Sequence, residues 1–290
     1  MSMEMTFLKI AEWTMAVSCN PALLGQTVNF RPFLCEATEG EADCHVWLDR
    51  EIAPVEGGPL QEARPDGRVL RIWKKADGIY IHIVYPDGVC RLHADAEWKN
   101  VETDARETDS LIVQEMNDVL MLAFAYSMAY AGGVLIHSSC VGLDNGRGAA
   151  FIGHSGIGKS THSRLWLRYV PASRLINDDQ PAVRVMPDGR IFLFGTPWSG
   201  KTPCYRDDRA ALKAIFCMRQ AEENRLVRMD AVKAFGELLK STSMMRCDLD
   251  SYRKIVQTLS TIVERVPIYR LENRPEKEAV DLSYGAVREI

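Results

Sequence analysis

The composition of the chain is that of a globular protein. It has 290 residues, of which 47% are hydrophobic and 26% are charged, enough to build the cores of a large domain and a smaller one. The formal net charge is -4, and acidic and basic residues are mixed along the chain. Because no continuous basic face results, nucleic acid is excluded as the expected partner.

Cysteine usage indicates the redox compartment. The eight cysteines include no C-x-x-C pair and no spacing typical of a disulfide framework or a zinc site. This pattern predicts reduced thiols and a cytoplasmic protein. The first residues lack a basic segment followed by an apolar one, so no secretory signal is expected. The oligomeric state stays open, with a homo-oligomer among the alternatives.

Residues 1–105 predict a β-rich N-terminal domain. His82 and His93 could share a strand face there, which leaves open a two-ligand metal site, although solvent-facing histidines are the commoner arrangement. The polar segment 97–109 is the predicted boundary to a second domain, 106–290. Three apolar runs separated by Asp-Gly turns predict a meander of hairpins, and these runs are 69–73, 79–85 and 89–93.

The stretch 119–136 contains no charged residue and approaches the length of a membrane span. Gly132-Gly133 divides it into a helix and a strand that begins at Val134. Glu115 and Asp118 extend the helix upstream. These features favour a buried core helix, so we expect no membrane association.

The second domain is predicted to alternate strands with helices. A strand over 134–141, a turn and a strand over 149–152 lead to a helix over 160–170. The elements expected after them are a hairpin over 182–194, a strand over 212–218, helices over 230–243 and 249–264, a strand over 266–271 and a terminal helix from 276.

Residues 153–160 form the most informative motif, a complete G-x-x-x-x-G-K-S phosphate loop (Walker A) between an apolar strand and a helix. Its glycines allow successive backbone N–H groups to face phosphate oxygens, and the lysine and serine supply a cation and a Mg²⁺ ligand. The motif therefore predicts ATP and Mg²⁺ as cofactors. His154 has no expected role, and His162 is expected at the surface. The residues expected to contact the nucleotide are Gly153, Ser155, Gly156, Ile157, Gly158, Lys159, Ser160 and Thr161.

Paired carboxylates follow the phosphate loop closely. An apolar run from Leu175 ends in Asp178 and Asp179, and Asp178 lies 19 positions beyond Lys159. One helix and a short loop suffice to return that strand end to the phosphates. There one carboxylate can hold Mg²⁺ while the other accepts a proton from an attacking hydroxyl.

With His137 on the strand before the loop, this arrangement resembles the catalytic domain of HPr kinase/phosphorylase, a family that belongs with the phosphoenolpyruvate carboxykinase-like folds. The resemblance covers residues 130–200. It implies an α/β P-loop domain with a mixed sheet, in which His137 helps to position the phosphate or the aspartates and Lys159 binds the β- and γ-phosphates. It further implies Mg²⁺ bound by Ser160 and Asp179 and proton abstraction by Asp178, and the two aspartates could exchange these roles.

Two features depart from that family. Thr161 stands where the family usually has an acidic residue, and the segment 195–201 (GTPWSGK) replaces the family's Gly-rich signature. This segment could be a substrate loop in which Trp198 stacks and Lys201 supplies a cation. The alternative is a tight connection between a hairpin and the next element.

Together these features predict an ATP-dependent phosphotransferase that moves the γ-phosphoryl group to a serine-type hydroxyl. The acceptor stays open among a protein, a peptide and free serine, and the resemblance also permits the reverse phosphorolysis. A regulatory protein that binds nucleotide without turnover is the alternative. A carboxykinase is disfavoured, because too little chain remains for its larger substrate site.

Overall fold

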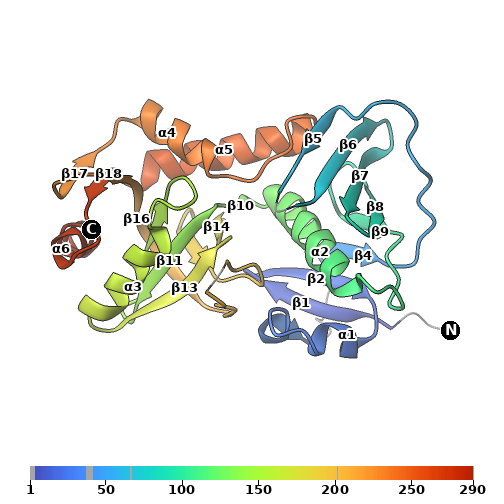
Figure 1. Ribbon diagram of the computed structural model, residues 1–290, viewed down its shortest axis with the longest axis horizontal. Coiled ribbons are helices and arrows are strands. Elements are labelled where there is room, and N and C mark those ends of the chain that lie inside the picture. Colours follow the sequence, from blue (N-terminus) through green and yellow to red (C-terminus); the bar gives the residue numbers. More distant parts are fainter. Residues whose placement is uncertain (1–3, 37–41, 66, 201, 290) are drawn as a thin grey trace. The chain divides into compact units, whose positions relative to one another are not determined.

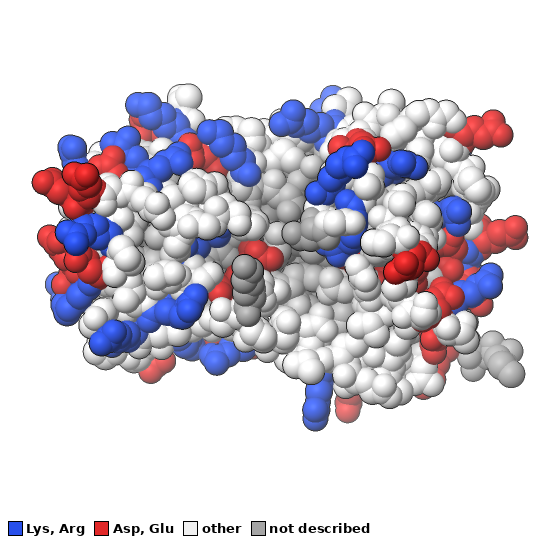
Figure 2. Space-filling view, viewed as in Figure 1, with Lys and Arg blue, Asp and Glu red and all other residues white. Residues whose placement is uncertain are grey.

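The computed structural model describes residues 4–36, 42–65, 67–200 and 202–289 and is of the mixed α/β class, with two mixed sheets. The chain divides into two compact units, Met1–Tyr130 with Met244–Lys254 and Ala131–Ser243 with Ile255–Ile290. This division differs from the expected boundary after residue 105, because the long helix that follows belongs to the first unit. On the face drawn in Figure 2, acidic and basic side chains are interspersed, in line with their mixing along the sequence.

The first unit is built on one sheet with a long helix, α2 (Figure 1). Its elements are β1 (Thr6–Ile10), β2 (Trp13–Ser18), α1 (Pro21–Gly25), the 3-10 helix η1 (Arg31–Phe33), β3 (Leu34–Cys35), β4 (Cys44–Trp47), β5 (Gln61–Ala63), β6 (Val69–Lys75), β7 (Gly78–Tyr85), β8 (Gly88–Ala94), β9 (Asn100–Thr103) and α2 (Ile112–Ala129).

Among the described residues, this sheet has the strand order β3-β1-β2-β4-β9-β8-β7-β6-β5. The predicted meander is confirmed as the consecutive antiparallel strands β6, β7 and β8. The isoleucines of β7 are fully buried, as their alternation predicts. His82 pairs with Arg91 and His93 pairs with Tyr80, so the two histidines do not face each other. Within the described ranges, no group of three His, Cys, Asp or Glu could hold a metal ion.

Helix α2 buries acidic side chains as well as apolar ones. Asp118 is 4% exposed and accepts hydrogen bonds from Arg68 at 2.6 Å and from Tyr85 at 2.8 Å, which satisfies its charge inside the unit. Burial raises the pKa of Glu115 on the same helix to about 6. The two contacts of Asp118 tie α2 to β7 and to the residue before β6. No helix in the described part of the chain is long and apolar enough to cross a membrane.

The second unit contains the phosphate-loop motif on a second sheet. Its elements are β10 (Gly133–Leu135), β11 (Ser138–Leu143), β12 (Arg147–Ile152), α3 (Lys159–Tyr169), β13 (Ser173–Asp179), β14 (Ala182–Val185), β15 (Ile191–Phe194), β16 (Arg209–Gln220), β17 (Arg225–Arg228), α4 (Ala231–Lys240), α5 (Leu249–Arg265, whose first six residues fall in the first unit), β18 (Ile268–Asn273) and α6 (Lys277–Arg288).

The order along the second sheet is β10-β14-β15-β16-β12-β11-β13, with β18 pairing with both β16 and β17. Strands β12, β16 and β18 run parallel, and the predicted hairpin over 182–194 is confirmed as β14 and β15. Phe151, Phe216 and Tyr269 stack across the three parallel strands, with ring centroids 5.5 and 5.7 Å apart. Helices α3 and α6 pack on this face through Trp166, Val280 and other buried residues.

The expectation that His162 lies at the surface is wrong. The side chain is 1% exposed, and its Nε2 lies 3.1 Å from the hydroxyl of Ser283 on α6. Its ring also packs edge-on against Phe151 at 4.7 Å. The His162 side chain is therefore buried between the sheet and α6 and contacts both.

Candidate nucleotide and phosphoryl-transfer site

The loop between β12 and α3 has the backbone conformation that its glycines permit. Gly153, Gly156 and Gly158 have φ angles of 147°, 81° and 107°, a region that side-chain-bearing residues seldom adopt. A Cβ added to Gly156 or Gly158 would meet nothing within 4 Å, so the backbone angle and not crowding requires glycine. Gly158 is the N-cap of α3, whose first turn carries no acidic residue, so its free N–H groups and dipole favour an anion.

Lys159 folds back over the start of this loop. Its Nζ donates hydrogen bonds to the carbonyl oxygens of Gly153 at 2.9 Å and His154 at 3.4 Å. Burial lowers the pKa of Lys159 below its ordinary value, while the charges of Asp179 and Asp178 act in the opposite direction. The lysine therefore lies within electrostatic reach of both aspartates.

Strand register explains how the loop and the aspartates meet. Strand β11 runs antiparallel to β12 on one side and to β13 on the other, and Ser138 at its start is opposite both Ile152 and Asp179. The C-terminal ends of β12 and β13 therefore lie at the same end of the sheet, separated by β11. Residues that follow such strand ends are where open α/β sheets bind ligands.

The two aspartates have different surroundings. The Asp178 side chain is 8% exposed, and its Oδ1 has no hydrogen-bond partner among the described residues. A buried carboxylate oxygen without a partner is costly, so it needs a cation or a proton donor from a ligand. Asp179 is half-buried, and its Oδ1 lies 3.7 Å from the Nε2 of His137.

His137 lies in the short connection between β10 and β11. The predicted continuous strand over 134–141 is wrong, because β10 pairs with β14 whereas β11 pairs with β12 and β13. Between them the N–H of Ile136 bonds to the carbonyl of Pro181 at 3.2 Å, and the N–H of His137 bonds to the carbonyl of Ser241 at 2.6 Å. This change of partners leaves the His137 side chain 44% exposed at the sheet edge.

Asn177 positions the end of β13, where the two aspartates lie. It is fully buried, and its Oδ1 accepts hydrogen bonds from the N–H groups of Asp179 at 2.9 Å and Gln180 at 3.0 Å. Its Nδ2 donates to the carbonyls of Thr196 at 3.3 Å and Trp198 at 3.1 Å. One amide thus joins the end of β13 to the segment that begins at residue 195.

That segment packs under the aspartates. A Cβ added to Gly200 would lie 3.0 Å from the carbonyl oxygen of Asp178 and 3.4 Å from the Cβ of Asp179. Trp198 is 5% exposed, so its ring is not available to stack on a substrate. These contacts favour the tight-connection interpretation of the segment. Lys201 lies outside the described residues.

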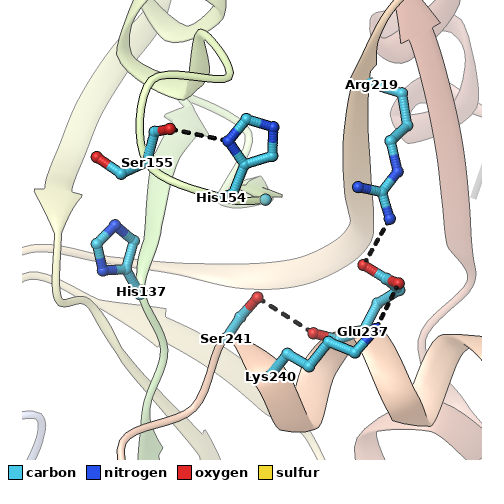
Figure 3. Close-up of a pocket in the computed structure, with 8 residues that line it drawn as sticks. His137, His154, Ser155, Arg219, Glu237, Lys240 and Ser241 are labelled. Atoms are coloured by element: carbon cyan, nitrogen blue, oxygen red, sulfur yellow. Dashed lines mark hydrogen bonds and ion pairs between the residues drawn. The ribbon is translucent and has the colours of Figure 1, made fainter.

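A pocket of about 360 Å³ opens beside the start of the phosphate loop (Figure 3). Gly153, His154 and Ser155 form one side, and His137 also lines it. The opposite side in Figure 3 carries Arg219 at the end of β16 and Glu237, Lys240 and Ser241 on and after α4.

The donor set fits magnesium. Mg²⁺ prefers oxygen ligands and is commonly held by one or two carboxylates together with phosphate oxygens. Ser160 in the first turn of α3 and the two aspartates at the end of β13 offer such oxygens, and the Asp178 carboxylate has the oxygen without a partner described above. In addition, the negative charge of Asp179 acts to raise the pKa of Lys159, so this carboxylate lies within electrostatic reach of the phosphate loop.

No family model matches the chain, and no curated protein matches it. Among the predicted residues, the sheet edge brings together His137, Lys159, Asp178 and Asp179. Sequence reasoning missed Asn177, Arg219, Glu237 and Lys240. Arg219 follows the predicted strand 212–218, and a charged residue at a strand's carboxyl end was a usable signal.

Proposed function

We propose that the protein is an ATP- and Mg²⁺-dependent phosphotransferase that moves the γ-phosphoryl group of ATP to a serine-type hydroxyl, with a P-loop fold of the HPr kinase/phosphorylase type. The observation that carries this proposal is the pairing of Ser138 with both Ile152 and Asp179. It supports a single site in which the phosphate loop and the paired carboxylates act on the same ligand.

In the proposed reaction the phosphates lie on the N–H groups of the loop and α3, and Lys159 leaves the loop carbonyls to reach the β- and γ-oxygens. Mg²⁺, held by Ser160 and Asp179, would neutralise charge on the phosphates. Asp178 accepts the proton of the acceptor hydroxyl, whose oxygen bonds to the γ-phosphorus as the bond to the β–γ bridging oxygen breaks. The products are ADP and the phosphorylated acceptor, and Asp178 later releases the proton to water.

His137 has a positioning role in this scheme. At 3.7 Å from Asp179, its Nε2 can orient that carboxylate. Asn177 has a second such role, because it fixes the backbone on which both aspartates stand. Neither side chain needs to touch the transferred phosphorus for catalysis to depend on it.

The test is transfer of label from γ-labelled ATP in the presence of Mg²⁺ to a panel that contains an HPr-like protein, free serine and serine-containing peptides. We expect label on at least one member, and roughly 10²-fold slower transfer when Asp178→Asn replaces the parent. If the parent binds ATP but produces neither transfer nor hydrolysis, the protein is a nucleotide-binding regulator and the proposal is wrong.

A further inference from the structure

The pocket beside the phosphate loop lies at the reacting end of the nucleotide site. Lys159, which must reach the β- and γ-phosphates, lies against the carbonyls of Gly153 and His154. Those same two residues line the pocket. His137, which contacts Asp179, lines it as well. The pocket therefore adjoins the terminal phosphate and the aspartates, where an acceptor has to enter.

The wall opposite the loop carries two cations and one anion. Arg219 Nη2 lies 3.0 Å from Glu237 Oε2, and Lys240 Nζ lies 3.2 Å from Glu237 Oε1 (Figure 3). Glu237 is 22% exposed, whereas the side chains of Arg219 and Lys240 are 45% and 74% exposed. An exposed ion pair on a helix is ordinarily of small consequence. Here Arg219, Glu237 and Lys240 line a pocket, and one positive charge remains after Glu237 neutralises one of the two cations.

These charges indicate the chemistry of the occupant. Glu237 demonstrates that the two cations are spaced to hold a carboxylate with one oxygen each. One remaining positive charge matches a singly charged carboxylate better than a phosphate dianion. The volume of about 360 Å³ is at the small end of ligand sites, so it suits an amino acid or the end of a peptide.

We propose that this pocket binds the phosphoryl acceptor and that Arg219 and Lys240 recognise a carboxylate close to the acceptor hydroxyl. The inference rests on the proposed function and deepens it. With a serine-type hydroxyl, the shared chemistry is a serine whose own carboxylate is free. Its two sources are free serine and the C-terminal serine of a peptide.

The experiment compares matched acceptors that differ only in this charge: L-serine against L-serinamide, and the peptide Gly-Gly-Ser against its C-terminal amide. Each is offered with γ-labelled ATP and Mg²⁺, and its binding is measured by calorimetry in the presence of ADP and Mg²⁺. We expect the acid of at least one pair to have a kcat/KM at least about tenfold above that of its amide, since charge-assisted hydrogen bonds are lost in the amide. A preference within the serine pair identifies a small molecule, and one confined to the peptide pair identifies a peptide end.

Variants locate the preference in the pocket. Arg219→Gln and Lys240→Gln should each raise KM for the preferred acid about tenfold, leave KM for the amide nearly unchanged and leave the Kd for ATP unchanged. The control is Lys233→Gln, which removes an exposed lysine of the same helix that pairs with Asp230 outside the pocket lining. It should behave like the parent.

Outcomes separate this inference from the proposed function. Equal use of acids and amides, binding of neither acid, or an acid preference that survives both pocket variants overturns the inference while phosphoryl transfer to other hydroxyls still stands. Absence of ATP binding, or ATP binding with neither transfer nor hydrolysis, overturns the proposed function itself.

Discussion

Protonation of His162 should destabilise the unit that carries the phosphate loop. Burial lowers the pKa of this histidine from 6.5 to about 4, because the buried ring keeps its neutral form. Its Nε2 contacts Ser283, whereas its Nδ1 is buried without a hydrogen-bond partner in the described part of the chain, so a second ring proton would find no acceptor there.

The sign and size of the effect follow from linkage. Between pH 6.5 and pH 4 the unfolded chain binds a proton at this residue and the folded chain does not, so the free energy of unfolding falls as the pH falls. At about 1.4 kcal/mol for each pH unit, the whole interval amounts to about 3 kcal/mol. The contribution is fully present above pH 6.5 and is lost on approach to pH 4.

The assay compares urea unfolding of the parent and of His162→Gln at pH 7 and at pH 4.5. Carboxylates titrate in both proteins, so the difference between their acid-induced losses isolates His162. We expect the parent to lose about 2 to 3 kcal/mol more than the variant. An NMR titration of the folded parent provides the direct check. A His162 pKa near 6.5, or equal acid losses in the two proteins, refutes the reasoning.

Three further predictions concern the site. Lys159→Met should keep the Tm of the ligand-free protein near that of the parent, because burial disfavours the lysine charge. It should abolish the rise in Tm on addition of ATP, which at 100 times Kd reflects about 3 kcal/mol of added free energy of unfolding in the parent; an equal rise in both proteins contradicts the phosphate-loop assignment. Asp178→Asn should lower turnover roughly 10²-fold with little change in the Kd for ATP, and unchanged turnover would mean that Asp178 is not the base. Trp198→Ala should lower the free energy of unfolding by about 3 kcal/mol or more because the side chain is buried; a selective rise in acceptor KM at unchanged stability would restore the substrate-loop interpretation.

Local patterns made part of the site predictable. The phosphate loop needs glycines at three positive φ angles within six residues, and such a constraint is visible in sequence. The aspartate pair was found for a similar reason, since it ends an apolar run at a short distance from Lys159. The meander β6 to β8 was visible because Asp-Gly turns and alternating isoleucines act over a few residues.

Non-local packing hid the rest. Arg219 and Lys240 line the same pocket only because β16 ends beside β12 and α4 ends next to His137, and neither pairing has a signature in the sequence. His162 was misplaced because nothing in the sequence of α3 indicates that the distant helix α6 covers this side chain, which also packs on Phe151 of the sheet. Trp198 lies between Gly and Pro residues typical of an exposed loop, and its burial depends on the distant bonds of Asn177.

The connection between β10 and β11 at His137 constrains how acceptor preference can change. The N–H of His137 is bonded to the carbonyl of Ser241, directly after α4, and Ile136 forms a bridge with Thr242. These bonds therefore connect the backbone at His137 to the backbone that follows Lys240. Side chains on the last turn of α4 can be exchanged to suit a different acceptor, whereas an insertion or deletion there would also shift His137. We therefore expect a different acceptor preference to arise by substitutions in the last turn of α4 and not by changes in its length.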